Sequence, residues 1–207
     1  NGATLITPAA VTLGASGIFQ VDNGGTYKHQ NTSAWASTIL QGIESFGNSS
    51  TVEINSTATT LPTNSSYGHL IINLTTDPGA DLSFNGLLTT INGSLTISNT
   101  QSRDIQLGTS TSSSLSIANN LSISGTSAFV FTAGTGSPDI TVNGNVTVSG
   151  GELDFCSSGA SGSSTLNVKG NFSHTSGSVT SAGSGSNGLL MNGNSMQTIE
   201  STGFASP

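Results

Sequence analysis

The chain has 207 residues, of which only 6% are charged, and its formal net charge is −7. Its basic residues, Lys28, Arg103 and Lys169, are too few to neutralise nucleic-acid phosphates or to form a polybasic membrane anchor. No apolar run reaches the roughly 18 residues of a membrane-spanning helix, so we predict neither a nucleic-acid partner nor membrane insertion. Because the chain opens at Asn1 without a signal peptide, we expect a fragment of a longer repeat protein.

The N-terminal part, residues 1–68, is predicted to be irregular. Residues 31–50 around Trp35 break the apolar pattern, and we interpret them as a loop insertion that contains a helical turn at 36–45. Outside this insertion, apolar residues alternate with polar ones over short stretches, as they do in half-buried strands. These stretches predict strands at residues 11–13, 18–21, 52–54, 70–74, 82–84 and 87–91.

A repeat of about 25 residues runs through residues 69–199. Turn-like segments recur at residues 92–94, 118–120, 143–145, 169–171 and 192–194. After each turn come three triplets of the form apolar, polar, apolar, which are strict in some repeats and degraded in others. One repeat contains Leu121-Ser122-Ile123, Phe129-Val130-Phe131 and Ile140-Thr141-Val142. A period of two indicates short strands whose first and third residues point inward.

Three short strands per repeat, separated by Gly, Ser and Asn turns, make one coil of a parallel β-helix. We therefore predict an all-β fold in which residues 1–207 form a single right-handed β-solenoid domain of roughly eight coils. Stacked coils align their inward residues into columns. Three such columns are Leu95, Leu121, Val146 and Phe172; Leu115, Ile140, Leu166 and Leu189; and Ile117, Val142, Val168 and Met191.

An asparagine occurs at the same place in four successive turns, at Asn120, Asn145, Asn171 and Asn194. Asparagine tolerates turn conformations and its side chain bonds to neighbouring backbone groups. We interpret this column as a structural ladder that bridges the coils, with a ligand site as the less favoured alternative.

Several segments resemble a block that recurs in large Bacteroidetes surface proteins. They are Gly24-Gly25-Thr26-Tyr27-Lys28-His29 followed by the Trp35 loop and residues 50–54, residues 81–97, residues 166–173, and residues 192–199. The resemblance implies a parallel β-helix segment of a long secreted or cell-surface protein, adhesin-like and exported by the type IX system. It supplies no catalytic residue.

Enzymes also occur on the β-helix fold, so catalytic groups have to be considered. The ten carboxylates are scattered: Asp22, Glu44, Glu53, Asp77, Asp81, Asp104, Asp139, Glu152, Asp154 and Glu200. Glu152 and Asp154 share the outward face of one predicted strand, but the alignment places Ala128, Val130, Ser178 and Thr180 beside them. Glycoside hydrolysis needs two carboxylates about 5–9.5 Å apart, a separation that Glu152 and Asp154 could approach. Because no third acid or base supports them, we predict no enzyme activity, no cofactor and no metal site.

The remaining reactive groups have structural interpretations. The single cysteine, Cys156, cannot form an intramolecular disulfide and is predicted to be a small, structural side chain. His174 falls on an inward position, where we expect a degraded core residue. Arg103 and Asp104 are adjacent and are expected to form a weak surface ion pair.

Two outward columns after the first triplet of each coil consist only of hydroxyl residues. They are Thr96, Ser122, Thr147 and Ser173, and Ser98, Ser124, Ser149 and Thr175. Such a flat grid resembles the ice-contacting faces of solenoid antifreeze proteins and could also contact a neutral polysaccharide. The competing interpretation is a solvated strand face, because threonine suits strands.

The sequence as a whole favours a non-catalytic structural segment, a rigid stalk or spacer of a bacterial surface protein. Its expected partners are adjacent repeats of the same chain and neutral polysaccharide or another surface. A binding module that uses the hydroxyl grid is the alternative, and a polysaccharide-degrading enzyme is the less favoured third class.

Overall fold

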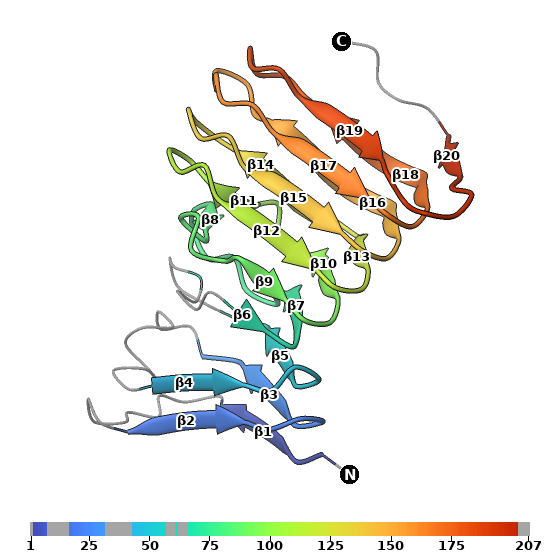
Figure 1. The fold of residues 1–207 in the computed structure, drawn as a ribbon. Coiled ribbons are helices and arrows are strands. Elements are labelled where there is room, and N and C mark those ends of the chain that lie inside the picture. The colour runs from blue at the N-terminus through green and yellow to red at the C-terminus, as the bar shows by residue number, and fades with distance from the viewer. Residues whose placement is uncertain (1, 8–16, 32–42, 57–60, 62–65, 203–207) are drawn as a thin grey trace.

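The computed structural model of the chain describes residues 2–7, 17–31, 43–56, 61 and 66–202. These residues form an all-β structure in which parallel sheets stack as a β-solenoid of about seven turns, roughly 25 residues apart. Figure 1 shows the coils following one another along a single axis, with β1 and β20 at opposite ends. None of the described residues is helical, so none of them forms a helix that could cross a membrane.

The strands fall into three columns that run along the solenoid axis (Figure 1). The first column consists of β1 (Thr4–Thr7), β3 (Thr26–His29), β5 (Thr51–Ile54), β7 (His69–Asn73), β10 (Leu95–Asn99), β13 (Leu121–Ile123), the first part of β16 (Val146–Cys156), the first part of β18 (Phe172–Thr180) and β20 (Ile199–Ser201). The second column consists of β8 (Leu82–Ser83), β11 (Asp104–Gly108), β14 (Ala128–Thr132) and the later parts of β16 and β18.

The third column consists of β6 (Ser66–Tyr67), β9 (Thr90–Ile91), β12 (Ser114–Ile117), β15 (Asp139–Val142), β17 (Thr165–Val168) and β19 (Gly188–Met191). Nearer the N-terminus, β2 (Ile18–Val21) and β4 (Ile43–Phe46) pair as a two-stranded sheet. The rings of Phe46 and Tyr67 stack with centroids 5.0 Å apart, which places β4 against β6 and continues the stack. Every strand pair among the described residues is parallel, as a solenoid requires.

The predicted core columns are confirmed. Leu95 pairs with Leu121, Leu121 with Val146, and Val146 with Phe172, and all four side chains are fully buried. The two columns of the third face pair in the predicted register as well. Each coil therefore buries its apolar side chains only against the coils above and below it.

The strands are longer than predicted where the first and second columns meet. In β16 and β18 the chain turns from one column to the next without leaving the sheet. Gly151 and Gly177 occupy these corners with φ angles of 66° and 84°, a conformation that residues with a Cβ adopt at a cost. A glycine corner thus keeps the backbone ladder continuous where separate strands were expected.

The N-terminal part differs from the prediction. The proposed insertion at 31–50 contains strand β4. Residues 43–45 of the proposed helical turn at 36–45 belong to this strand and are not helical. The rest of that turn, and the predicted strand at 11–13, lie outside the described residues. In the first column, Thr26, Thr51 and His69 stand in one register, so the coil geometry starts well before residue 69.

Candidate functional site

The first hydroxyl column forms as predicted. Thr96 pairs with Ser122, Ser122 with Thr147, and Thr147 with Ser173, and each side chain is half-buried on the outward face. The column is bounded by Ile71 on one side and by Glu200 on the other. It therefore presents four hydroxyls in a row, one per coil, at a spacing of about 4.8 Å.

The prediction of the second hydroxyl column is wrong for its last residue, Thr175. The register shifts after Val148, so that Ser149 lies opposite Ser176 instead of Thr175. The irregularity occurs immediately before the glycine corner, where the backbone changes direction. Ser98 also turns towards the backbone, and its hydroxyl donates to the Ile72 carbonyl at 3.4 Å. The structure thus aligns one hydroxyl column of the grid and disrupts the other.

A similar column occurs on the third face. Ser66, Thr90, Ser116 and Thr141 stand in register on outward positions. Aligned hydroxyls are therefore a general feature of this solenoid, because small β-compatible polar residues occupy many of its solvent-facing strand positions.

The asparagine column is a hydrogen-bonded ladder, as predicted for three of its four members. The backbone N–H of Asn145 donates to Asn120 Oδ1, that of Asn171 donates to Asn145 Oδ1, both at 2.8 Å, and that of Thr198 donates to Asn171 Oδ1 at 2.9 Å. Asn194 is not the next member, because Ile199 rather than an earlier residue pairs with Phe172. The prediction missed the extra residues that the chain inserts at this turn.

The same ladder continues towards the N-terminus with different side chains. The N–H of Asn120 donates to Ser94 Oγ at 3.3 Å, and the N–H of Ser94 donates to His69 Nδ1 at 3.1 Å. Histidine, serine and asparagine thus perform one task, which is to accept the N–H of the next coil where the main-chain ladder leaves it without a carbonyl. Their chemical variety explains why the sequence shows only part of the column.

Four carboxylates approach one another on the second column. Glu152 lies opposite Ala128 and Ser178, and Asp154 opposite Val130 and Thr180, as the alignment predicts. Asp104 lies opposite Ala128 two coils away from Glu152, and its backbone N–H donates to Asp81 Oδ1 at 3.1 Å. Asp104 and Asp81 were not predicted to belong to this group, although Asp104 and Glu152 occupy the same strand position two coils apart.

Burial decides the electrostatics of this group. Asp154 is only 7% exposed, and burial raises its pKa in spite of the Cys156 N–H that donates to its Oδ1 at 3.0 Å. Burial also raises the pKa of Asp104, with the charges of Asp81, Glu152 and Asp154 acting in the same direction. Glu152 Oε1 accepts a hydrogen bond from Thr180 Oγ1 at 2.6 Å. The described residues contain no group of three or more side chains that could hold a metal ion.

Replacing Asp154 with asparagine is expected to stabilise the protein at neutral pH. The amide keeps an acceptor for the Cys156 N–H and removes a buried charge. We expect the melting temperature to rise by about 2–4 °C at pH 7, which corresponds to about 1 kcal/mol in a chain of this length. Thermal melts followed by circular dichroism at pH 3 to 8 measure the effect.

The sign of the pH dependence follows from the raised pKa. As the pH falls through the raised pKa, the native carboxyl of Asp154 takes up a proton and the cost of its charge disappears. The advantage of Asp154→Asn should therefore shrink as the pH falls and vanish below the ordinary aspartate pKa of about 3.9. The control Asp139→Asn removes an exposed charge and should change little; a destabilised Asp154→Asn variant at pH 7 would contradict the interpretation.

Within the part of the chain that the structure describes, two ion pairs link neighbouring coils. Arg103 donates from Nε to Asp77 Oδ1 at 2.8 Å and from Nη2 to Asp77 Oδ2 at 2.9 Å, and it lowers the pKa of that carboxyl to about 2. The predicted pairing of Arg103 with Asp104 is therefore wrong. Lys28 Nζ lies 2.6 Å from Glu53. Burial alone would raise the pKa of Glu53, but hydrogen bonds from Lys28 and Asn55 outweigh it and the pKa is lowered.

The other two candidate residues, Cys156 and His174, are both buried. Cys156 is fully buried and its thiol donates to the Gly162 carbonyl at 3.2 Å. His174 is buried at an inward position, as predicted, and its ring nitrogens lie 3.1 Å from Ser201 Oγ and from the Gly177 carbonyl. Both side chains are engaged inside the stack rather than presented to solvent.

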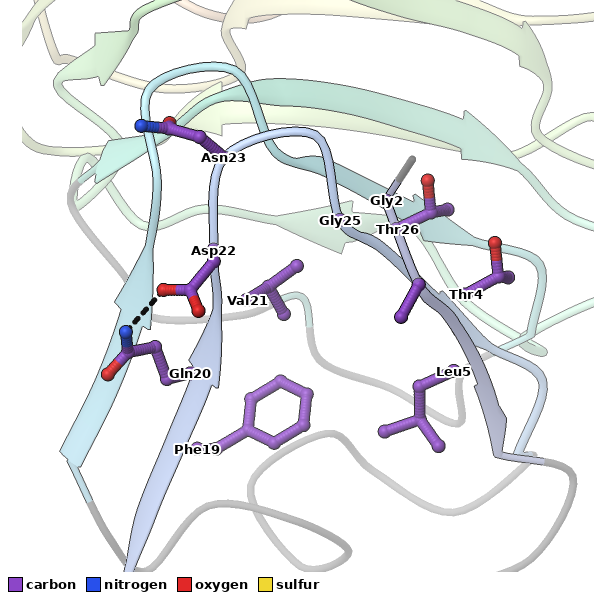
Figure 2. Close-up of a pocket in the computed structure, with 11 residues that line it drawn as sticks. Gly2, Thr4, Leu5, Phe19, Gln20, Val21, Asp22, Asn23, Gly25 and Thr26 are labelled. Atoms are coloured by element: carbon purple, nitrogen blue, oxygen red, sulfur yellow. Dashed lines mark hydrogen bonds between the residues drawn. The ribbon is translucent and has the colours of Figure 1, made fainter.

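A pocket of about 540 Å³ lies at the N-terminal end of the solenoid. Figure 2 shows Leu5, Phe19 and Val21 pointing into it, with Gln20 hydrogen-bonded to Asp22 at its side. The Phe19 ring packs edge-on against Tyr27 with centroids 4.9 Å apart. The pocket is thus the end of the core column, lined by the side chains that would stack on a further coil.

No protein-family model, no curated protein and no solved structure matches the chain.

Proposed function

We propose that the chain is a non-catalytic structural segment, a rigid spacer within a secreted or cell-surface bacterial protein. The observation that carries the proposal is the continuity of the stack. From β1 to β20 each strand of the first column pairs with the next in parallel, and the side-chain ladder from His69 to Thr198 accompanies it on the outer edge.

Stiffness follows from this construction. In a solenoid every coil contacts only its neighbours, so bending the axis would open main-chain hydrogen bonds and side-chain ladder bonds on the same edge. The core columns of Leu, Ile, Val and Phe resist sliding, because a shift of one residue would turn the inward side chains out to solvent. A spacer needs this resistance and needs no reactive group.

The proposal of a surface location rests on the resemblance to Bacteroidetes surface proteins and on the composition. Few charges and many Ser, Thr and Asn residues suit an exterior that contacts neutral surfaces. An adhesin-like parent protein exported by the type IX system is the corresponding proposal for the context of the segment.

Two measurements test the spacer role. Small-angle X-ray scattering of the purified chain should give a rigid particle with a stack length of about 34 Å, from about seven turns at a rise of about 4.8 Å per coil. Incubation with a panel of neutral and acidic polysaccharides should release no product. Cleavage that disappears in Glu152→Gln or Asp154→Asn would overturn the proposal, and so would a scattering profile of a flexible chain.

The aligned hydroxyls favour a second candidate, a binding module for glycan or ice. Thr96, Ser122, Thr147 and Ser173 provide four hydroxyls at one-coil spacing on a flat sheet. A glycan array and an ice-affinity assay test this candidate with Thr147→Leu as the disabling variant. Thr141→Leu, on the hydroxyl column of the third face, is the matched control. Binding that Thr147→Leu abolishes and Thr141→Leu preserves would establish it; absence of binding in both assays would exclude it.

A further inference from the structure

Six Asn–Gly pairs lie within the described residues, and they carry a chemistry of their own. They begin at Asn23, Asn85, Asn92, Asn143, Asn187 and Asn192. In such a pair the glycine nitrogen can attack the asparagine side-chain carbonyl, because glycine has no side chain to hinder the approach. The attack requires the glycine N–H to lose its proton and to leave any hydrogen bond that holds it.

In five of these pairs the solenoid holds the glycine N–H by main-chain bonding. Each donates to a backbone carbonyl of a neighbouring coil at 2.8–3.2 Å: Gly24 to Ser49, Gly86 to Leu107, Gly93 to Gly68, Gly144 to Asn119 and Gly188 to Ser164. Freeing any of these nitrogens requires two coils to separate locally, and such opening is costly in the interior of a stack.

The sixth pair is held differently. The Gly193 N–H donates to Oε1 of Gln197 at 2.7 Å, an acceptor on a rotatable side chain. Gln197 is itself attached to the coil below, since its Nε2 donates to the Val168 carbonyl at 2.9 Å and also to the Gly170 carbonyl. Asn192 is exposed. The glycine nitrogen can therefore be freed by a side-chain rotation, with the coils still stacked.

We propose that Asn192 is a self-modification site that deamidates in the folded protein, with Gln197 as the group that restrains it. The deprotonated nitrogen of Gly193 forms a bond to Cγ of Asn192, the bond from Cγ to Nδ2 breaks, and Nδ2 leaves as ammonia after taking up a proton. Water then opens the succinimide ring and leaves aspartate or isoaspartate at position 192. The step needs no oxidant, reductant or enzyme, and it adds one negative charge to the last described coils.

Peptide mapping by mass spectrometry of the folded 207-residue protein, incubated at mildly alkaline pH, tests the proposal. Asn192 should convert at least about tenfold faster than Asn143, a ratio that corresponds to roughly 1.4 kcal/mol between a side-chain rotation and a coil opening. In urea, where the coils are open, the same two sites should convert at similar rates. Equal rates at Asn192 and Asn143 in the folded protein would overturn the proposal.

A pair of glutamine variants tests the restraint separately. Gln197→Ala removes the acceptor of the Gly193 N–H and should accelerate conversion of Asn192 several-fold, with the circular dichroism spectrum unchanged. Gln101→Ala is the matched control, because Gln101 Nε2 also donates to a carbonyl of a neighbouring coil, that of Leu74 at 2.8 Å, but restrains no Asn–Gly pair. If Asn192 converts at an unchanged rate in Gln197→Ala, Gln197 does not restrain the Gly193 nitrogen and the proposal is overturned.

Discussion

Replacing Phe129 with alanine is expected to lower the free energy of unfolding by about 3–5 kcal/mol, the usual cost of removing a fully buried phenylalanine. Phe129 is fully buried between Ile105 and Leu153 in its core column. Its ring meets Phe131 edge-on with centroids 5.4 Å apart. The coils on either side pair through their backbones and cannot collapse into the cavity, which favours the upper part of the range. Urea denaturation followed by circular dichroism measures the loss.

A solvent-facing substitution on a nearby coil provides the control. Ser116 is exposed on β12, and Ser116→Ala should change the stability by less than about 0.5 kcal/mol. If Phe129→Ala costs no more than Ser116→Ala, the core columns do not hold the stack together, and the packing described above is wrong.

Gly151→Ala is expected to lower the free energy of unfolding nearly as much as Phe129→Ala. The cause is backbone strain and a clash with a backbone oxygen, not a lost contact in the apolar core. Gly151 has a φ angle of 66°, and a Cβ at this position would lie 2.2 Å from the Ser127 carbonyl oxygen. A left-handed conformation costs a residue with a Cβ about 1–2 kcal/mol, and forced repacking adds about 1–3 kcal/mol. Thermal or urea denaturation should show a combined loss of about 2–5 kcal/mol.

Gly159 separates the two contributions. Its φ angle is 82°, but a Cβ there would meet nothing within 4 Å. Gly159→Ala should therefore show only the conformational cost, and the difference between the two variants isolates the clash with the coil below. Equal losses in both variants would mean that the corner is not close-packed.

The alternation within each triplet predicted the inward columns from β10 onwards, but Val130 and Asp154, which it places on the outward face, are buried as well. Inward and outward positions follow from a period of two, and the repeat length places Leu95, Leu121 and Val146 in one column. The register of Glu152 and Asp154 against their neighbours follows from the same alignment. These features are local in the sequence, because each depends only on a triplet and on its distance from the next turn.

Two of the wrong predictions have a common cause, which is that turns and corners vary in length. The last turn inserts extra residues, so Thr198 replaces Asn194 in the ladder. The corner glycines shift the register beyond Val148 and remove Thr175 from its column. The Arg103 prediction is wrong for a different reason, because its partner Asp77 lies one ordinary repeat of 26 residues back along the chain. A deviation of one residue in a turn leaves the strand pattern intact but changes which side chains meet across coils.

The scarcity of charge and the 25-residue period determined, from the sequence alone, that this chain is a solenoid with a narrow apolar core and a hydroxyl- and amide-rich exterior. Both are properties of short segments, and short segments determine which side chains face inward. Only the tertiary structure decided which surface groups act together: the mixed ladder from His69 to Thr198, the carboxylates of Asp104 and Asp154, and the Gln197 restraint on Gly193. Those interactions join residues one or two repeats apart or pass through a turn, and their partners depend on the length of the coils between them.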